Sequence, residues 1–590
     1  MAEQRYAIPN NPTELRKLSP HQLKEIATAL RHTIIQTLAN GEGHLGSSLG
    51  TVELTLALHY VFNTPEDILI WDVGHQAYSH KLLTERQVDF ALLRQFKGLS
   101  GFPNRNESRF DAFGTGHAGT SISAALGMAL SHQLFGKEQH HIAVVGDASI
   151  VNGMAFEALN HLGTTSANVL VVLNDNTMGI DPSVGALKHY FENVKTETPS
   201  TPNFFKSLNL DYSGPIDGHD IEQLLKALKQ QKKKSGPRIL HIVTKKGKGL
   251  SEAENQQVIY HAPGKFDPLT GKLNPLASQQ KLKYQEVVGK TLLELTKNNP
   301  KMITITPAMP TGSGLVELME EFPDRCIDVG IAEQHAVTLA AGMATTGMLP
   351  FCVIYSTFLQ RAYDQIIHDV ALQNLPVVFC IDRSGLVGHD GPSHHGVFDI
   401  AYLRSIPNLT IVAPRNAKEI QNLLFSLQQG IDSPVAIRYP RGDSELESLS
   451  FDFSPIIWGR GEQLKTGTTI AVISVGSLAK TITSALDNMP QPDSFAHFDL
   501  RFIKPIDEEL LHRIFSQFKG VICFEEGTIK GGAGTALLEF AAENRYSLPV
   551  QVVGIPDEFI PHGNSERLKI ELGLDSSGIA KTLTRFRNNI

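Results

Sequence analysis

Residues 142–178 read IAVVGDASIVNGMAFEALNHLGTTSANVLVVLNDNTM. Two continuous apolar runs, Ile142 to Val145 and Val169 to Leu173, are typical of buried strands. The stretch between them opens on a sharp turn at Gly146-Asp147 and then follows the amphipathic pattern of a helix to about Leu162. Together these elements predict a βαβ unit in a parallel sheet, around which we expect the first part of the chain to fold.

A polar residue follows each of the two predicted strands. Asp147 and Asn176 lie 29 positions apart and come at the carboxyl ends of neighbouring strands, where open α/β sheets bind ligands. Both offer hard oxygen atoms, which suit Mg²⁺ or Ca²⁺, and phosphate oxygens are expected to complete the coordination. Taken singly, each residue could merely cap a helix or a turn. The pair at two strand ends favours a metal–diphosphate site.

Composition places the chain among ordinary globular enzymes. Hydrophobic residues make up 41% and charged residues 19% of the 590 positions, and the net charge is −8. No basic footprint indicates a nucleic-acid partner, so local Arg, Lys or a metal ion must hold any anionic substrate. No apolar run is long enough to span a membrane, and MAEQRYAIPN has neither a signal-peptide core nor a transit pattern. We therefore expect a cytoplasmic protein.

The cysteines agree with a reducing compartment. The four of them form no CxxC pair, and three lie in apolar, strand-like runs. Buried free thiols fit this pattern better than disulfides or zinc ligands. They are Cys326, Cys352, Cys380 and Cys523.

Strand-like runs and helical patterns alternate through the rest of the chain in three blocks. We predict three consecutive α/β domains with mainly parallel sheets, covering residues 1–275, 276–450 and 451–590. The polar, Pro-rich residues 195–203 predict a mobile loop, and residues 262–280 predict a linker between domains.

Three glycine-flanked histidines, His44, His75 and His117, precede the predicted metal–diphosphate site in the chain. A lone histidine is more often structural than catalytic, but three in loops of one α/β domain favour a shared cleft. Residues 41–46 spell GxGxxG, but this stretch follows a predicted helix and not a strand. We therefore reject a dinucleotide fingerprint there.

The stretch around Asp147 resembles the diphosphate-binding signature of thiamine diphosphate enzymes, with Ala148 where that signature has its second glycine. Four stretches, DVGHQAYSHK, GMAFEALNHLG, IAEQHAV and LVGHDGPSHHGVFD, resemble the 1-deoxy-D-xylulose-5-phosphate synthase family, and the resemblance continues into RYPRG and PDEFIPHG. It implies a transketolase-like homodimer with thiamine diphosphate between the first two domains of the chain. It also implies condensation of pyruvate with D-glyceraldehyde 3-phosphate, with loss of CO₂, to give 1-deoxy-D-xylulose 5-phosphate for isoprenoid, thiamine and pyridoxal synthesis.

The resemblance further implies roles for individual residues, and these roles suit the chemistry of their side chains. The Mg²⁺ ligands would be Asp147, Asn176 and the backbone carbonyl of Met178. Contacts to thiamine diphosphate would come from His75, Gly116, His117, Ala118, Ala148, Ser149 and one lysine of the KKGKG turn, either Lys248 or a neighbour. Glu333 would hydrogen-bond the aminopyrimidine ring, while proton transfers would fall to His44, His75 and His394. The substrate would be held by Tyr355, Arg383, Asp390 and Arg441, with the arginines at its phosphate.

Three departures from the family pattern are visible. Ala148 fits without strain only if its φ is negative. HAGTS stands where the family usually has HSSTS, which removes hydroxyl groups near the diphosphate. The segment between Leu187 and Phe204 is several helical turns shorter than usual, which bears on closure of the site more than on its chemistry.

Other functions compete with this interpretation. Within thiamine enzymes, the runners-up are a transketolase and the decarboxylating subunit of a 2-oxoacid dehydrogenase. From a different class, His389, Asp390, His394 and His395 could form a metal-hydrolase cluster, although Gly391-Pro392 prevents one helix face from presenting them. A catalytically impaired homologue is a third alternative, supported by Ala148 and the short segment.

Overall fold

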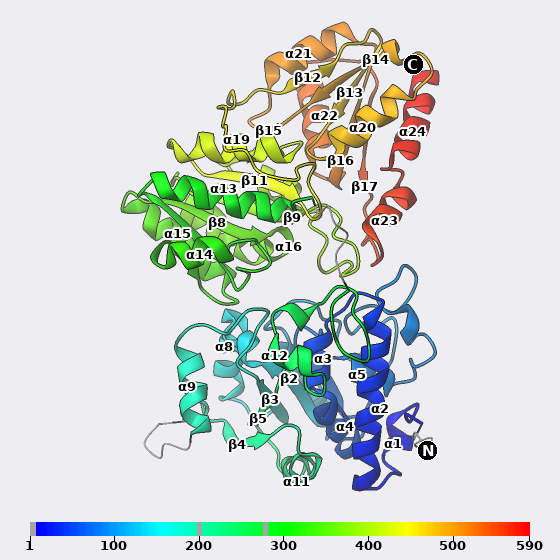
Figure 1. Cartoon of the computed structure of the whole chain (residues 1–590), viewed down its shortest axis with the longest axis vertical. Helices are drawn as coiled ribbons and strands as arrows, with labels where there is room; N and C mark the ends of the chain where they lie inside the picture. The colour runs from blue at the N-terminus through cyan, green and yellow to red at the C-terminus, as the bar shows by residue number, and fades with distance from the viewer. Residues whose placement is uncertain (1–6, 197–202, 275–280) are drawn as a thin grey trace. The chain divides into compact units, whose positions relative to one another are not determined.

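The computed structural model describes residues 7–196, 203–274 and 281–590 (Figure 1). The chain divides into two compact units. The first comprises Met1–Leu276 with Gly330–Ala332, and the second comprises Ala277–Val329 with Glu333–Ile590.

The first unit is built on a five-stranded parallel sheet of order β1-β2-β3-β5-β4. Its strands are β1 Ile68–Trp71, β2 His141–Gly146, β3 Val169–Asp175, β4 Asp211–Asp217 and β5 Arg238–Val243. Its helices are α1 Pro12–Leu15, α2 Pro20–Ala39, α3 Leu45–Gly50, α4 Val52–Val61, α5 Tyr78–Leu82, α6 Ser121–Leu134, α7 Asp147–Ile150, α8 Gly153–Leu162, α9 Ala186–Lys195, α10 Phe204–Ser207, α11 Ile221–Lys232 and α12 Ser251–Asn255.

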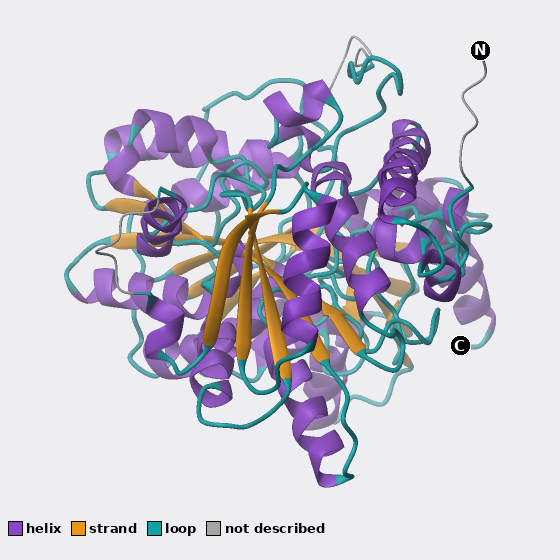
Figure 2. Cartoon of the chain, turned by 90° about the horizontal axis from the view of Figure 1, so that it is seen from below, coloured by secondary structure: helices purple, strands orange, loops and turns teal. Residues whose placement is uncertain are grey.

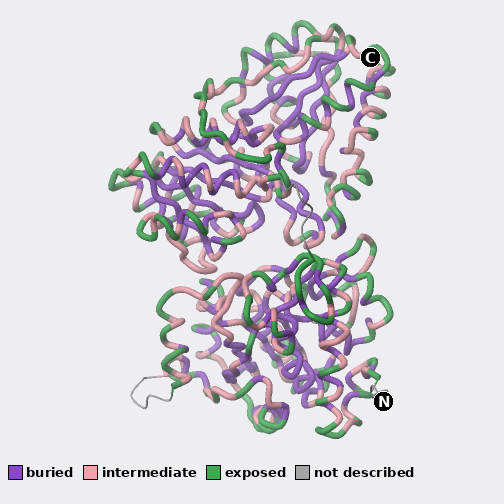
Figure 3. The backbone as a smooth tube through the Cα atoms, viewed as in Figure 1, coloured by how far each residue is buried: buried purple, intermediate pink, exposed green. Residues whose placement is uncertain are grey.

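Alternation along β2 explains why helices cover both faces of this sheet. Ile142 and Val144 join the apolar cluster formed with α2, α4 and α11. Ala143 and Val145 join the opposite cluster, formed with α6, α8 and α9. Because both faces are buried, the strands read as continuous apolar runs, and Figure 3 shows burial concentrated along them.

The second unit contains two sheets, of order β15-β10-β11-β9-β8-β6-β7 and β12-β14-β13-β16-β17. The strands of the first are β6 Met302–Thr306, β7 Cys326–Asp328, β8 Leu349–Tyr355, β9 Val378–Ser384, β10 Thr410–Val412, β11 Val435–Pro440 and β15 Phe502–Lys504. Those of the second are β12 Glu462–Lys465, β13 Ile470–Ser474, β14 Phe495–Asp499, β16 Gly520–Thr528 and β17 Val550–Ile555. The helices are α13 Tyr284–Asn298, α14 Val316–Glu321, α15 Glu333–Thr345, α16 Ser356–Leu359, α17 Tyr363–Gln365, α18 Asp399–Arg404, α19 Ala417–Gln428, α20 Leu478–Asp487, α21 Glu508–Gln517, α22 Ala533–Glu543, α23 Ser565–Leu572 and α24 Ser576–Asn588.

The prediction of three successive α/β blocks with mainly parallel sheets is confirmed, and Figure 2 shows the strands packed among helices. Among the named strands of the described residues, the only antiparallel pairs are β12 with β14 and β15 with β10. Strand β15 follows residue 450 in the chain but adds to the second sheet, beside β10. All four cysteines are buried free thiols. No helix in the described part of the chain is long and apolar enough to cross a membrane.

The expected linker at 262–280 is only partly a linker. The boundary between the two units falls within it, but its described part, 262–274, packs on the first unit. Phe266 is buried in the core there, its N–H donates to the carbonyl of Ala39, and the Tyr260 hydroxyl donates to Gly271 O at 2.5 Å. Because the residues around Phe266 are largely polar, the sequence pattern does not predict that this side chain anchors the stretch to the core. Residues 197–202 of the expected mobile loop and 275–280 of the linker lie outside the described residues.

Candidate active site

In the first unit, Asp147 and the turn from Asn176 to Ser183, which we call the metal loop, lie at the carboxyl ends of neighbouring strands β2 and β3. Asp147 begins α7 directly after β2, Asn176 follows β3, and these strands pair in register with Gly146 opposite Asn174. Asp147 is buried, and its Oδ1 accepts a hydrogen bond from the Asn176 N–H at 3.3 Å. Its Oδ2 accepts from the Ser183 hydroxyl at 2.8 Å. The two predicted ligands are therefore adjacent.

A closed turn holds the residues after Asn176. The Asn176 side-chain oxygen accepts from the Met178 N–H at 3.0 Å, and Met178 pairs with Pro182 in an isolated bridge. Ser183 N–H donates to the carbonyl of Thr177 at 3.1 Å. The turn thus brings Ser183 back to Asp147 and fixes the backbone around Met178.

Ala148 adopts this geometry without strain. It lies within α7, and its φ is not among the positive values of the described residues. Its Cβ lies 3.3 Å from the place that a Cβ on Gly179 would occupy. A side chain at position 179 would therefore crowd Ala148, whereas alanine at position 148 fits beside Gly179.

Electrostatics favour a cation at the metal loop. Burial, together with the negative charge of Asp175, raises the pKa of Asp147 to about 7. A buried carboxylate beside an amide oxygen is a donor set that suits Mg²⁺, whose charge would offset the cost of burying the ionised group. The residues present therefore fit the ion that the family resemblance implies.

Lys246 is the lysine of the KKGKG turn that reaches this loop. Its side chain is buried, and Nζ donates to the carbonyl oxygens of Gly179 at 2.7 Å and Ile180 at 3.3 Å. Burial lowers the pKa of Lys246 to about 8. Lys248 instead contributes its backbone carbonyl to Arg31, at 3.0 Å from the arginine Nε. Lys246 thus replaces Lys248 as our candidate for a diphosphate contact.

Three histidines cluster in the first unit. The ring centroids of His44 and His75 lie 5.6 Å apart, and His261 lies 5.3 Å and 5.7 Å from them. Two of these were predicted to share a cleft. His261 was missed because it lacks glycine neighbours and lies beside the expected linker, so no local pattern marks it. Arg94 Nη1 approaches His44 Nδ1 at 3.4 Å, which adds a cation to the group.

His75 is poised as a neutral ring. Burial and the positive charge of Lys246 lower the pKa of His75 to about 3. Its Nδ1 atom is buried and has no hydrogen-bond partner among the described residues. Buried polar atoms are normally satisfied, so this nitrogen indicates a ligand or a water molecule at the site.

Asp72, directly after β1, shapes the loop that contains Gly116, His117 and Ala118. Its carboxylate accepts from the N–H groups of Gly119 at 2.8 Å and Ser121 at 3.0 Å, where α6 begins. The roles predicted for Gly116, His117 and Ala118 toward the cofactor, and for Ser149, stay predictions.

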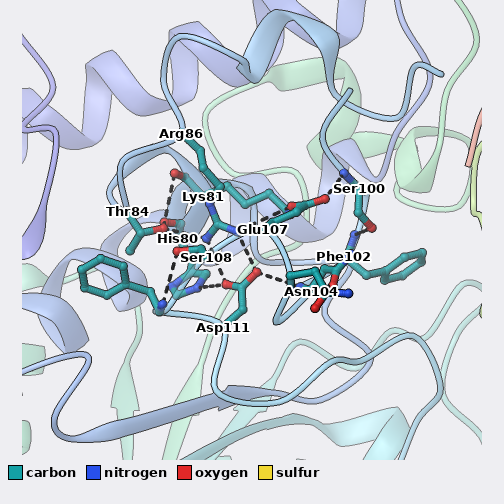
Figure 4. Close-up of polar contacts among 12 residues, drawn as sticks. His80, Lys81, Thr84, Arg86, Ser100, Phe102, Asn104, Glu107, Ser108 and Asp111 are labelled. Carbon is teal, nitrogen blue, oxygen red and sulfur yellow. Dashed lines mark hydrogen bonds and ion pairs between the residues drawn. The ribbon is translucent and has the colours of Figure 1, made fainter. Parts of the chain in front are cut away.

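A buried polar network braces the loop beside His44 (Figure 4). Asp111 accepts from His80 Nε2 at 2.8 Å, from both terminal nitrogens of Arg86 at 2.6 and 3.0 Å, and from Asn104 N–H at 2.7 Å. Glu107 pairs with Lys81 at 2.6 Å and accepts from the Ser100 N–H. The braced loop presents Phe102, whose ring lies 5.5 Å from that of His44.

The network also assigns a structural role to His80, because both of its ring nitrogens contact buried side chains. His80 Nδ1 lies 2.9 Å from His59 Nε2, and His59 Nδ1 lies 2.8 Å from the Thr64 hydroxyl. Burial lowers the pKa of both histidines, so both are neutral. Since ionised Asp111 can only accept, the protons must run from Thr64 through His59 and His80 to Asp111. Every ring nitrogen is then used.

Asp111→Asn should destabilise the first unit by roughly 3–5 kcal/mol, because it removes the shorter of the two ion pairs of buried Arg86 and leaves only the 3.7 Å pair with Glu107. The free energy of unfolding in urea at pH 7 measures this loss. Burial would raise the pKa of Asp111, but hydrogen bonds from His80 and Arg86 hold it well below its usual range. The stabilising contribution is therefore complete above an unfolded-state pKa of about 3.9 and is lost as the pH falls below it.

Asp89→Asn is the matched control, since Asp89 is exposed and caps no helix with its side chain. It should change the free energy of unfolding by less than about 0.5 kcal/mol. Equal stability of the two variants at pH 7 would contradict the role given to Asp111.

In the second unit, Glu333 begins α15 as a buried residue. Burial raises its pKa, and the charge of Arg361, whose Nη1 lies 4.0 Å from Glu333 Oε2, lowers it in part. A carboxyl group in such a place takes up a proton more readily than a solvated one, and in its protonated form it can donate a hydrogen bond.

Tyr355 and Arg383 meet at the ends of β8 and β9. The Arg383 guanidinium lies 4.0 Å above the Tyr355 ring, and Arg383 has a positive φ of 58°. The Tyr355 hydroxyl and Arg383 Nε are buried without hydrogen-bond partners among the described residues. Phe358 stacks on Tyr355 at 5.5 Å and contacts His394 edge-on at 5.8 Å. The structure thus brings three predicted site residues together.

Arg441 and Asp390 border the same region. Arg441 Nη1 donates to the carbonyl of Val387 at 2.7 Å and lies 3.8 Å from Asp390 Oδ2. The third sheet supports this loop, because Glu526 of β16 accepts from the Leu386 N–H at 2.8 Å.

The metal-hydrolase alternative is not supported. His395 Nδ1 accepts from the Val387 N–H at 3.1 Å, and its Nε2 lies 3.3 Å from the carbonyl of Pro561. Both ring nitrogens are therefore occupied. Across the described residues, no group of three His, Cys, Asp or Glu side chains could hold a metal ion.

Three domain families match the chain. 1-Deoxy-D-xylulose-5-phosphate synthase matches residues 7–202 and 194–244, the transketolase pyrimidine binding domain matches 280–445, and the transketolase C-terminal domain matches 459–579. The first match consists of two pieces, which overlap at residues 194–202 of this chain.

Curated relatives agree over nearly the full length. The 1-deoxy-D-xylulose-5-phosphate synthase of Cytophaga hutchinsonii is 47% identical over 616 aligned positions, which cover 97% of each chain. That of Bacteroides fragilis is 46% identical over 625 positions, covering 98% of this chain and 95% of the relative. That of Nitrosomonas europaea is 46% identical over 607 positions, covering 97% of each. Identity at this level over this length shows that the chain belongs to the 1-deoxy-D-xylulose-5-phosphate synthase family of transketolase-like, thiamine diphosphate-dependent enzymes.

Proposed function

We propose that this chain condenses pyruvate with D-glyceraldehyde 3-phosphate, with loss of CO₂, through the residues described above. The observation that carries the proposal is the contact between buried Asp147 and half-buried Asn176 at neighbouring strand ends in a chain of this family. Thiamine diphosphate, when bound, supplies the electron sink for decarboxylation and carbon–carbon bond formation. The protein must then anchor the cofactor, move protons and hold the aldehyde phosphate.

The first unit would hold the diphosphate end. Asp147, Asn176 and the Met178 carbonyl would bind Mg²⁺, and the ion would be shared with diphosphate oxygens. Neutral His75 and the nearby His44 would transfer protons, since a buried neutral imidazole can both accept and donate. Because HAGTS lacks two hydroxyl groups of the family pattern, the backbone of 116–118 and Lys246 would be prominent among the donors to the diphosphate.

Lys246→Met should weaken binding of thiamine diphosphate about tenfold, because it removes a buried cation that can form a charge-assisted hydrogen bond to phosphate. Lys248→Met, two residues away in the same turn, is the matched control and should change affinity less than about twofold. Isothermal titration with thiamine diphosphate in excess Mg²⁺ measures both. A larger loss of affinity in Lys248→Met than in Lys246→Met would instead assign the diphosphate contact to Lys248.

The second unit would hold the aminopyrimidine ring and the substrates. Glu333 would hydrogen-bond that ring, and the raised pKa of its carboxyl group suits an exchange of protons with the ring. Arg383 and Arg441 would bind the phosphate of the aldehyde, with Tyr355 and Asp390 beside them and His394 exchanging protons with the substrate. The buried, unpartnered hydroxyl of Tyr355 supports a polar ligand at this place.

Mg²⁺ as the ion, a homodimer as the working form and the cytoplasm as the compartment belong to the same proposal. The hard oxygen ligands support the first, the family resemblance supports the second, and four buried free thiols support the third.

The direct test is release of CO₂ from pyruvate with thiamine diphosphate and Mg²⁺, with and without D-glyceraldehyde 3-phosphate. We expect release that depends strongly on the aldehyde. A transketolase would instead exchange two-carbon units between sugar phosphates without pyruvate, and an impaired homologue would bind cofactor without releasing CO₂.

A further inference from the structure

The short segment after the metal loop forms a helix whose last residue returns to that loop. Helix α9 ends at Lys195, and Lys195 Nζ lies 2.9 Å from Asp175 Oδ2 and 3.1 Å from its Oδ1. Asp175 is the last residue of β3 and stands between Asn174 and the predicted Mg²⁺ ligand Asn176. The ion pair therefore joins α9 to the base of the metal loop.

Asp175 is fully engaged on its other sides. Its Oδ2 lies 3.0 Å from His241 Nε2, whose Nδ1 lies 2.8 Å from the Tyr212 hydroxyl. Its Oδ1 accepts from the Thr177 N–H at 3.2 Å, directly within the metal loop. The carboxylate is completely buried, whereas the Lys195 side chain is 22% exposed. Lys195 is thus the cation that compensates a buried charge, and it approaches from the solvent side.

An apolar contact holds the middle of α9 on the same sheet. Phe191 is buried, stacks on Phe205 at 6.4 Å and meets the His241 ring at 5.7 Å. The Tyr190 hydroxyl accepts from the Phe204 N–H at 3.0 Å, which ties α9 to the start of α10. Helix α9 is therefore packed on its own unit and does not project from it.

The comparisons bear on the length of this part of the chain. The match to the synthase domain breaks into two pieces that meet at 194–202, and the relatives of Cytophaga and Bacteroides align over 616 and 625 positions, more than the 590 of this chain. The relatives therefore contain residues for which this chain has no counterpart. Lys195 lies where the two pieces of the synthase-domain match overlap.

We infer that Lys195 is a positioning residue that, through Asp175, fixes the metal loop for binding Mg²⁺ and thiamine diphosphate. The inference rests on the proposed function of that loop. The Lys195–Asp175 pair holds the Thr177 N–H and hence the turn from Asn176 to Ser183, so that Asp147 and Asn176 meet the ion in a fixed geometry. In this role Lys195 acts on the site only through Asp175.

Lys195→Met should raise the dissociation constant of thiamine diphosphate at fixed Mg²⁺ about tenfold, as expected when a supporting contact of a metal site is lost. The turnover number at saturating cofactor should stay within about twofold, because the reacting groups are unchanged. Lys188→Met is the matched control, on the same helix but with no ion pair among the described residues. Lys195→Arg, which keeps the charge, should bind within about threefold of wild type.

Hydrogen exchange in the cofactor-free chain gives a readout independent of activity. Amides of residues 176–186 should exchange at least about tenfold faster in Lys195→Met than in Lys188→Met, because the turn loses its anchor. Equal exchange and equal cofactor affinity in these two variants would overturn the inference, as would an equal loss in Lys195→Arg. Failure of the wild-type chain to bind thiamine diphosphate would refute the proposed function instead, and the exchange rates would still decide whether Lys195 holds the loop.

Discussion

Glu333→Ala should lose turnover by about 10³-fold or more while still binding thiamine diphosphate and Mg²⁺, a loss within the range for a positioned proton-transfer group. The residue is buried at the start of α15, and burial raises the pKa of its carboxyl group. Alanine cannot form the hydrogen bond to the aminopyrimidine ring that we assign to Glu333. The diphosphate end of the cofactor is held by other residues, so its affinity should change less than about tenfold.

Steady-state turnover and calorimetric titration, made on one preparation, separate these two effects. Glu320→Ala is the control, since Glu320 is exposed on α14, the helix that precedes Glu333 in the chain. Full activity of Glu333→Ala would contradict the assignment. So would a variant that no longer binds the cofactor, because Glu333 would then be an anchor and not a catalytic group.

Asp147→Asn should abolish the Mg²⁺-dependent part of cofactor binding, with a loss in affinity of at least about 100-fold, since changes around metal ligands alone cost 10–100-fold. Asparagine keeps the shape of Asp147: its Oδ1 can still accept from the Asn176 N–H, and its Nδ2 can donate to the Ser183 hydroxyl oxygen. It removes the negative charge, which a divalent cation requires at this buried place.

Titration of the variant with thiamine diphosphate, at rising Mg²⁺ concentrations, measures this loss. Glu157→Gln, an equal change of charge on the exposed face of α8, should bind like wild type. If Asp147→Asn retained the Mg²⁺ dependence of the wild-type chain, the ion would have to bind elsewhere.

Much of the first unit could be predicted because local pattern and global fold agree. The apolar runs at 142–145 and 169–173 are buried on both faces, so their strands had to be parallel and neighbouring, which places Asp147 beside Asn176. Ser19-Pro20 predicts an N-cap and a first helical position, and the capping box between Ser19 and Gln22 at the start of α2 confirms it. The stretch from Ser121 to Leu134 predicts a helix, and α6 has these bounds.

Contacts between distant segments could not be predicted in this way. Lys246 and Lys248 differ in burial because Gly247 turns the chain with φ +84° and bonds to Gly46, and no periodic pattern reports such a turn. His261 joins His44 only through folding of a stretch that looked like a linker. The pairing of Lys195 with Asp175 depends on α9 folding back onto the sheet, which the polar sequence after Phe191 does not indicate.

The most direct test of the account is identification of the product formed from [2-¹³C]pyruvate and D-glyceraldehyde 3-phosphate by the chain with thiamine diphosphate and Mg²⁺, with Glu333→Ala as the inactive control. The account predicts that the label appears by NMR as the carbonyl carbon of 1-deoxy-D-xylulose 5-phosphate, with one CO₂ released for each product molecule. Release of CO₂ without a five-carbon product, or no reaction in a chain that demonstrably binds the cofactor, would contradict it.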